Sequence, residues 1–291
     1  GNFDGLHSGH QKLFQQAKKF KKKLSLKLGV ITFDPIPKMF FNKKIKNYRI
    51  SNFEQKISYF ENFGVDFLIN KSFNKKFSKI TSHNFIENIL YKRLKLKYIF
   101  VSNNFRFGYK REGNVKLLKK YQDKYKFKLI NPKPLKQNNK IISSTLIRKL
   151  LQNGNLNIAN KILKRHWSIE GIVEKGRMMG KKIGFPTCNI DIKNYIIAKI
   201  GVYAVKAKIN NRGKTYKGIA NLGFRPTFNQ KKILLEVNLF NFSGNLYNKL
   251  LSVEFLKFIR KEKKFNNVNE LSTQIKKDLN IAKKIKWLNH K

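Results

Sequence analysis

Cysteine is almost absent from this chain of 291 residues, and long apolar runs are missing altogether. Cys188 is the only cysteine, which excludes an intramolecular disulfide and a zinc site built from several thiolates. No run of about 18 apolar residues is present that would span a bilayer, and the first residues lack the charged-then-apolar order of a signal peptide. We therefore expect a reduced, soluble protein of the cytoplasm without a membrane partner.

Acidic residues are also scarce, with 16 Asp and Glu against 64 Lys and Arg and a formal net charge of +48. Such an excess is typical of proteins that bind nucleic acid, since clustered cations release counterions from a polyanion. Only ten of the basic residues are Arg, however, although recognition of phosphates and bases favours the forked guanidinium. The Lys are spread over both halves beside much Asn, Ile and Phe, which indicates compositional drift. Nucleic-acid binding is a competing hypothesis that we do not favour.

The length and the patterning predict two domains. Helical and extended patterns alternate up to about residue 130, with helices expected near 11–23, 53–63, 82–93 and 115–125 and strands near 26–33, 65–69, 98–102 and 127–130. This alternation predicts βα units that build a Rossmann-like domain around a parallel sheet.

The pattern changes after Trp167. Residues 131–140 resemble a loop and precede short helices at 145–152 and 156–163. Beyond them the sequence predicts strands near 169–174, 202–209, 216–222, 233–239 and 251–258, and a terminal helix near 269–288. We expect a small antiparallel β-barrel with a C-terminal helix, and we place the domain boundary near Arg165, giving domains of 1–165 and 166–291.

The first ten residues bring glycines and two histidines to the start of a helix. His7 and His10 are three residues apart and so share one face, while helix N–H groups and the helix dipole favour an anion there. This arrangement predicts a phosphate-binding turn. The alternatives are a structural His pair and a metal site with a third ligand. Its remaining members are Gly1, Asn2, Phe3, Asp4, Gly5 and Gly9.

A second helix start carries three hydroxyl residues. Ser143, Ser144 and Thr145 precede Arg148 by about one turn, which suits the binding of a triphosphate. The hydroxyls would equally well serve only as helix caps.

A glycine-rich, cationic loop leads into an extended segment in the second domain. Thr187 and Asn189 are two residues apart, so both side-chain oxygens point to one face and can hold Mg²⁺ beside ATP phosphates, while Cys188 points to the other. The loop residues expected to contact phosphates are Gly176, Gly180, Lys181, Gly184 and Pro186.

Glu236 lies in the strand-like run 233–239. It shares a face with Asn238, whereas Leu235 and Val237 face the other way. A carboxylate on such a strand can accept a proton from an attacking hydroxyl. An ordinary solvent-facing Glu is the alternative.

The N-terminal motifs resemble those of prokaryotic bifunctional riboflavin kinase/FAD synthetase. The similarity includes the His-x-Gly-His turn, the Ile-Ser-Ser-Thr helix start at 142–145, the Phe-Asp-Pro-Ile-Pro segment at 33–37 and the Asn-Phe-Arg-Phe-Gly segment at 104–108. The resemblance implies that His7, His10, Ser144, Thr145 and Arg148 contact ATP phosphates. It also implies a flavin contact through Asn104, Phe105, Arg106, Phe107 and Gly108.

This half departs from the family at Ile36, Asn104 and Leu146, where His, Asp and often Arg are usual. The family also has a β-strand directly before the turn that opens this chain. We therefore expect the first domain to lack its first strand and its turnover to be reduced.

The second half, 168–285, is similar to riboflavin kinase through Gly-Phe-Pro-Thr-x-Asn at 184–189, the segments 201–205 and 218–223, and Phe-Ile-Arg at 258–260. The resemblance implies that Thr187 and Asn189 bind Mg²⁺ and ATP, that Glu236 is the base acting on the riboflavin 5′-hydroxyl, and that Arg260 contacts flavin. Departures at Lys181, Asn238, Asn241 and Asn248 lie outside these catalytic positions.

The expected function is phosphorylation of riboflavin to FMN in the barrel and adenylylation of FMN to FAD in the α/β domain. ATP is the co-substrate and Mg²⁺ the metal of both steps. An enzyme with only the kinase activity and a degenerate N-terminal domain is the main alternative.

Overall fold

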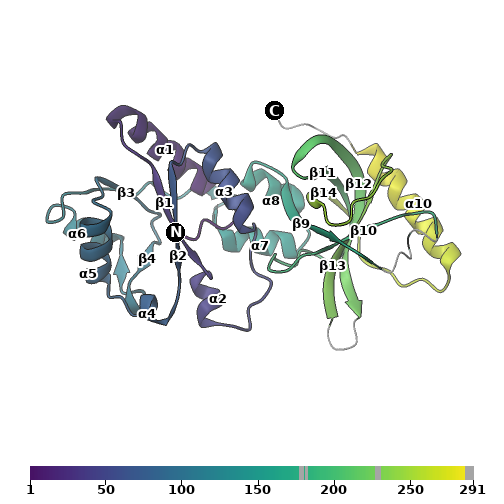
Figure 1. The fold of residues 1–291 in the computed structure, drawn as a ribbon, viewed down its shortest axis with the longest axis horizontal. Coiled ribbons are helices and arrows are strands. Elements are labelled where there is room, and N and C mark those ends of the chain that lie inside the picture. Colours follow the sequence, from purple (N-terminus) through teal and green to yellow (C-terminus); the bar gives the residue numbers. More distant parts are fainter. Residues whose placement is uncertain (177–179, 181–182, 227–230, 286–291) are drawn as a thin grey trace. The chain divides into compact units, whose positions relative to one another are not determined.

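The computed structural model describes residues 1–176, 180, 183–226 and 231–285. The chain divides into two compact units, one formed by Gly1–Lys46 and Phe53–Ser143 and the other by Asn47–Asn52 and Ser144–Lys291 (Figure 1). Each unit has its own hydrophobic core.

The first unit alternates helices with short strands. Its helices are α1 (Ser8–Leu24), α2 (Pro37–Phe41), α3 (Phe53–Asn62), α4 (Lys75–Ser78), α5 (Ser82–Asn84), the π-helix η1 (Phe85–Arg93), the 3₁₀-helix η2 (Tyr109–Arg111) and α6 (Val115–Tyr121). Its strands are β1 (Gly29–Asp34), β2 (Phe67–Ser72), β3 (Tyr98–Phe100), β4 (Arg106–Phe107), β5 (Gly113–Asn114), β6 (Lys128–Ile130), β7 (Lys136–Gln137) and β8 (Lys140–Ile141).

The main strand pairs of this unit are parallel, as the alternating pattern predicts. β1 pairs with β2, with Gly29 opposite Phe67, and β3 pairs with β6, with Tyr98 opposite Lys128. Parallel neighbours require a crossover between them, and helix α3 provides one after β1. The predicted α/β class with parallel pairing is confirmed.

The segment 131–140 is not entirely a loop. β7 and β8 form an antiparallel hairpin there, with Lys136 opposite Ile141. Asn138 and Asn139, with φ of 47° and 59°, occupy the left-handed region that a two-residue hairpin turn needs. The prediction of a loop over 131–140 is therefore wrong for the hairpin residues, because Asn138 and Asn139 form a turn that pairs the flanking residues.

Along the residues that the structure describes, the second unit combines helices with a closed barrel. Its helices are α7 (Ser144–Gln152), α8 (Leu156–Leu163) and α10 (Val268–Lys284). Its strands are β9 (Trp167–Glu174), β10 (Cys188–Asp191), β11 (Gly201–Ile209), β12 (Arg212–Pro226), β13 (Lys231–Leu239) and β14 (Leu250–Arg260), and they close in the order β10-β13-β12-β11-β14-β9.

Every pairing in this barrel is antiparallel, and its interior is filled by large side chains. The rings of Trp167 and Tyr203 both contact Phe255, at centroid distances of 4.6 and 5.0 Å, and all three residues are fully buried. Helix α10 covers one side through Ala282, which packs with Val202 of β11 (Figure 1). The predicted barrel with a C-terminal helix is confirmed.

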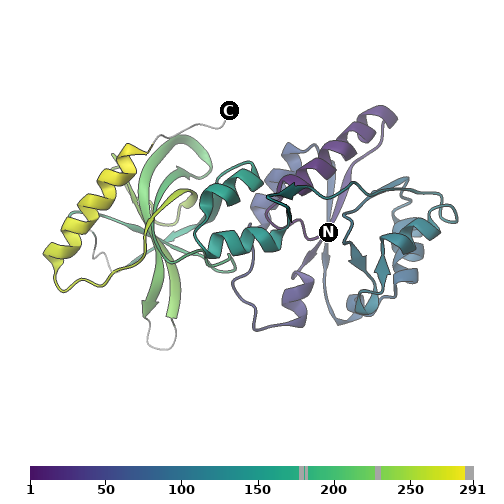
Figure 2. The same cartoon turned by 180° about the vertical axis from the view of Figure 1, so that it is seen from behind.

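Helices α7 and α8 belong to the barrel's unit and lie side by side (Figure 2). The amide nitrogen of Asn160 on α8 donates to the carbonyl of Phe255 at 3.0 Å, and the amide oxygen accepts from the backbone of Trp167 at 2.8 Å. The change from helices to strands falls between α8 and β9. The boundary between the two compact units falls earlier, between Ser143 and Ser144. The boundary near Arg165 stays a prediction for the functional domains.

Candidate active sites

Three polar residues form a row across neighbouring strands of the barrel. Glu236 of β13 lies opposite Asn189 of β10 on one side and opposite Asn221 of β12 on the other. Directly paired residues of antiparallel strands point to the same face, so the three side chains lie together. The flanking rows, which include Leu235 and Val237, are buried in the barrel interior, and the polar row therefore faces outward.

Asn189 is nevertheless 93% buried, with a relative exposure of 7%, and its oxygen Oδ1 has no hydrogen-bond partner among the described residues. The Gly176 backbone covers it so closely that a Cβ there would overlap the Asn189 amide. A buried acceptor without a partner is unfavourable unless a ligand supplies a donor or a cation. The loop and the row thus form one site.

Two further described residues of this loop, Gly180 and Pro186, approach side chains beside the row. A Cβ added to Gly180 would lie 3.2 Å from the hydroxyl of Thr187, which is exposed. The amide nitrogen of Asn238 donates to the carbonyl of Pro186 at 2.7 Å, and Gly184 has a φ of 83° that favours glycine. Lys181, predicted to contact phosphates, lies outside the described residues.

Cys188 points away from this site, as its position between Thr187 and Asn189 predicts. Its Sγ donates to the carbonyl of Val237 at 3.4 Å. Burial raises the pKa of its thiol to about 12, so the thiol stays protonated and is no nucleophile.

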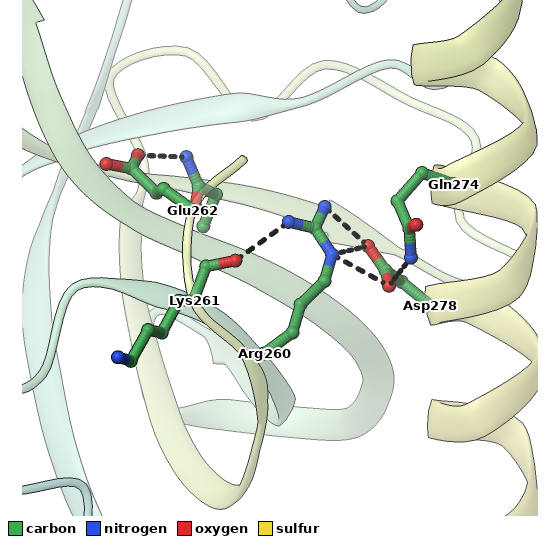
Figure 3. Close-up of polar contacts among 6 residues, drawn as sticks. Arg260, Lys261, Glu262, Gln274 and Asp278 are labelled. Carbon is green, nitrogen blue, oxygen red and sulfur yellow. Dashed lines mark hydrogen bonds and ion pairs between the residues drawn. The ribbon is translucent and has the colours of Figure 1, made fainter. Parts of the chain in front are cut away.

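Arg260, predicted to contact flavin, is engaged in an ion pair at the end of β14. Its guanidinium meets both carboxylate oxygens of Asp278 on α10 at 2.8 to 3.0 Å and donates to the carbonyl of Lys261 at 3.0 Å (Figure 3). Gln274 donates to the same carboxylate at 2.9 Å. The structure thus gives Arg260 a role in fixing α10 to the barrel, and a flavin contact stays a prediction.

In the first unit, the two histidines stack on each other at the start of α1. Their ring centroids are 3.7 Å apart, and Nδ1 of His7 accepts from the backbone N–H of His10 at 3.4 Å, which makes His7 the N-cap. Gly5 in the preceding turn has a φ of 77°, and Phe3 packs edge-on against His10. Gly1 lies beside β1, since its nitrogen donates to Ile31 at 2.7 Å.

The environment of His10 keeps its imidazole neutral. Burial, together with the neighbouring His7, holds the pKa of His10 well below its usual range, and its Nδ1 is buried without a hydrogen-bond partner among the described residues. A bound anion would reverse this shift, because an opposite charge favours the protonated form. No group of three His, Cys, Asp or Glu that could hold a metal was found in the part of the chain that the structure describes.

Ile142, near the end of the first unit, lies close to this turn. A Cβ on Gly9 would lie 3.8 Å from the carbonyl oxygen of Ile142, which directly precedes Ser143. Asp4, in the same turn, is buried. Ser143 closes the first unit, whereas Ser144 belongs to the second.

Arg148 is buried on α7 rather than extended into solvent. Its Nε donates to the carbonyl of Tyr48 at 2.8 Å, and its guanidinium carbon lies 3.7 Å from the centroid of that ring. Thr145, on the same helix, is exposed. Tyr48 is a contact that sequence reasoning did not find, because it lies 100 residues earlier in the chain.

The predicted flavin segment at 104–108 forms β4 and its flanks. Phe107 is buried in the core of the unit, and Phe105 stacks on it with ring centroids 5.4 Å apart. Arg106 is exposed, Asn104 accepts from the hydroxyl of Ser102 at 2.8 Å, and Gly108 has a φ of 75°. Of the two rings, only Phe105 is partly accessible to a ligand.

Two residues of the barrel site were missed by sequence reasoning. Asn221 lies beside Glu236, and its amide nitrogen donates to Oε1 of Glu262 at 3.2 Å. No local spacing links these residues, so only the strand register could reveal them. Asn221 lies within the family-like segment 218–223, which was the available signal.

An α/β unit with a His pair at a helix start and a barrel with a Glu–Asn row are the two parts of a nucleotide-dependent transferase. Two family models divide the chain in the same way: FAD synthetase matches residues 1–146 and riboflavin kinase matches residues 163–286. The chain belongs to the family of bifunctional riboflavin kinases/FMN adenylyltransferases.

Individual relatives agree over nearly the whole length. The bifunctional riboflavin kinase/FMN adenylyltransferase of Buchnera aphidicola subsp. Schizaphis graminum is 42% identical over 98% of this chain and 92% of its own length. The Escherichia coli protein of that name is 35% identical over 96% of this chain and 88% of its own.

A solved structure has the same architecture. It is described as a macrolide-efflux protein from Streptococcus pneumoniae, has a TM-score of 0.87 at 30% identity, and covers 98% of this chain and 93% of that one. In the ranges that the structure describes, no helix of the present chain is long and apolar enough to cross a bilayer.

Proposed function

We propose that the barrel transfers the γ-phosphoryl group of ATP to riboflavin, giving FMN and ADP. Glu236 takes the proton of the riboflavin 5′-hydroxyl while the oxygen of that hydroxyl bonds to the γ-phosphorus of ATP. The bond between this phosphorus and the bridging oxygen breaks, and ADP leaves with that oxygen. The observation that carries this proposal is the register of Glu236 opposite Asn189, whose buried oxygen lacks a partner among the described residues. This register places a carboxylate that can act as a base beside a hydrogen-bond acceptor that is available to a ligand.

Thr187 and Asn189 would hold the Mg²⁺ of this step. Their oxygens are the ligand type that Mg²⁺ takes when most of its shell comes from phosphates and water, and the uncompensated Oδ1 of Asn189 fits such a cation. When bound, the metal neutralises charge on the transferring phosphate. The loop residues Gly176, Gly180 and Gly184 with Pro186 and Lys181 would surround the nucleotide through backbone N–H groups and one ammonium.

We propose that the first unit carries the second step, in which an FMN phosphate oxygen attacks the α-phosphorus of ATP and pyrophosphate leaves. No protein nucleophile is needed, so the work of the protein is positioning and charge stabilisation. His7, His10 and the first N–H groups of α1 suit the phosphates, with the turn Gly1–Gly5 and Gly9 allowing close approach. Ser143 would add a donor, and Mg²⁺ would assist as in the first step. Ser144, Thr145 and Arg148 are proposed as further contacts of ATP phosphates.

The flavin of the second step would lie against the segment 104–108. Phe105 offers a partly buried ring and Arg106 an exposed cation for a phosphate. We further propose that Arg260 borders the flavin of the first step while it remains paired with Asp278. Riboflavin, FMN and ATP are the small-molecule partners of this scheme.

The test supplies riboflavin, ATP and Mg²⁺ to the purified chain and separates FMN from FAD by chromatography over time. FMN should rise first and FAD follow, and added FMN should give FAD without the first step. FMN without FAD would contradict the second half of the proposal, and neither product would contradict both halves.

A further inference from the structure

The barrel site contains a second acceptor that the proposed chemistry leaves unused. Glu236 has Asn189 on one side and Asn221 on the other, and directly paired residues have Cβ atoms about 5 Å apart. Oδ1 of Asn221, like that of Asn189, is buried without a hydrogen-bond partner among the described residues. Mg²⁺ and phosphates account for Asn189, so Asn221 needs a ligand of its own.

The orientation of the Asn221 amide is fixed by chemistry. Its neighbour Glu262 is a carboxylate that accepts hydrogen bonds, so the end of the amide that meets Oε1 at 3.2 Å must be the NH₂ group. Oδ1 is therefore the end turned away from Glu262. Gly223 makes this contact possible, since a Cβ there would overlap the Glu262 carboxylate.

Glu262 is itself held in place by the end of β14. Arg260 forms an ion pair with Asp278 and donates to the carbonyl of Lys261 (Figure 3). Glu262 follows directly and accepts from Asn221 of β12. The series from Asp278 through Arg260 to Glu262 thus sets the Asn221 amide. An arrangement with this many contacts indicates a positioned acceptor.

The charges at this end of the row favour a neutral ligand. Glu236 lies beside both Asn residues, and each Asn has a second carboxylate next to it, Glu174 opposite Asn189 and Glu262 at Asn221. Lys232 neutralises Glu174 through an ion pair at 3.0 Å, whereas Glu262 has no ion pair among the described residues and would repel a triphosphate. An amide oxygen accepts from a hydroxyl and repels a phosphate oxygen. The row therefore has a phosphate end at Asn189 and a hydroxyl end at Asn221.

We propose that Asn221 binds the phosphoryl acceptor, with Oδ1 accepting a hydrogen bond from a hydroxyl of the ribityl chain other than the reacting one, and that Glu262 is the positioning residue that aims it. This inference rests on the proposed kinase function of the barrel. It adds a specificity contact for a polyol chain on the side of Glu236 opposite to the nucleotide.

The experiment measures FMN formation in the full chain with Asn221→Ala, Glu262→Ala and Glu262→Gln. Loss of one neutral hydrogen bond should raise the KM for riboflavin about 3- to 10-fold in Asn221→Ala and leave the KM for ATP within about twofold. Glu262→Ala should give a smaller increase, and Glu262→Gln should restore the value because its amide oxygen still accepts from Asn221. Asn245→Ala, in an exposed loop of the same barrel, is the matched control.

Riboflavin analogues that lack a single ribityl hydroxyl provide the direct readout. In the unmodified chain, one analogue should have a KM about 3- to 10-fold higher than that of riboflavin. In Asn221→Ala, the KM values of this analogue and of riboflavin should be almost equal. The inference would be overturned by a rise in the KM for ATP instead of riboflavin. It would also be overturned if every analogue kept its full increase in KM over riboflavin in Asn221→Ala. If the unmodified chain forms no FMN, the kinase proposal itself fails, which is a distinct result. Urea unfolding followed by Trp fluorescence reports whether the barrel of each variant is folded, because Trp167 is buried there and the first unit contains no Trp.

Discussion

The two candidate sites are built in different ways. In the barrel, Glu236 is fixed by hydrogen-bonded strands on both sides, and its neighbours Asn189 and Asn221 are distant in sequence. In the first unit, His7 and His10 are fixed by one helix start and by contacts between residues only three positions apart in the sequence. The comparison teaches that a sheet register assembles a site from remote residues, whereas a helix cap assembles one locally.

The largest expected effect sharpens the barrel half of this comparison. Glu236→Gln removes the proton acceptor while keeping the shape of the side chain, and FMN formation should fall about 10²- to 10⁴-fold. FAD formation from added FMN should persist. Both products are measured by chromatography.

Glu254→Gln is the matched control for that variant, since Glu254 lies on β14 of the same barrel. An equal loss of FMN formation in both variants would show that the barrel tolerates no replacement of a Glu on its strands. Loss of FAD formation in Glu236→Gln would contradict separate sites.

The next effect concerns the histidine turn. His10→Ala removes the imidazole that we propose contacts the ATP phosphates, so FAD formation should fall about 10²-fold while FMN formation stays unchanged. ATP binding to the Glu236→Gln chain, measured by calorimetry, should strengthen as pH falls, because burial holds the pKa of His10 well below its usual range in the free protein and a nearby anion would raise it.

That pH dependence should disappear when His10 is replaced. His83→Ala, at an exposed His of the same unit, is the control and should change neither rate. An unchanged FAD rate in His10→Ala would remove this turn from the second step.

A third effect tests what holds the barrel site together. Arg260→Ala leaves the Asp278 carboxylate buried without its cation, and such a loss destabilises by about 3 kcal/mol or more. Urea unfolding followed by Trp fluorescence measures it, since Trp167 is buried in the barrel and the first unit contains no Trp. Arg212→Ala, at an exposed Arg on β12, should change stability little. A stable Arg260→Ala protein with impaired riboflavin binding would instead assign Arg260 to the flavin.

The sequence predicts local features of this molecule well and remote ones poorly. The two classes of domain, the confirmed family, and most strands and helices follow from periodicity and motifs. The His pair follows from spacing alone, because a helix start is a local structure. The hairpin at 136–141 was missed because two Asn at its turn resemble any polar loop.

The row at Glu236 shows where sequence reasoning ends. Asn221 and Glu262 meet only after β12 and the end of β14 are placed in the barrel, and they lie 41 residues apart. The contact of Arg148 with Tyr48 spans 100 residues. Nothing in local spacing encodes such pairs, which depend on the closure of the barrel and on packing against α7.

The smallest effect concerns an ion cluster on the barrel that has no part in either site. Burial alone would raise the pKa of Glu254, but hydrogen bonding to His166 at 3.1 Å and the nearby Lys206 ammonium at 3.3 Å outweigh it and lower that pKa. A carboxylate whose pKa is lower in the folded state stabilises the fold above its unfolded pKa of about 4.3, and this contribution is lost as pH falls through the folded value. Glu254→Gln should therefore lower stability at pH 7 by less than about 1 kcal/mol, since Glu254 is one third exposed. The difference from the unmodified chain, measured by urea unfolding with Trp167 fluorescence, should shrink below about pH 4. A difference that stays constant with pH would show that packing, and not the charge of Glu254, stabilises this part of the barrel.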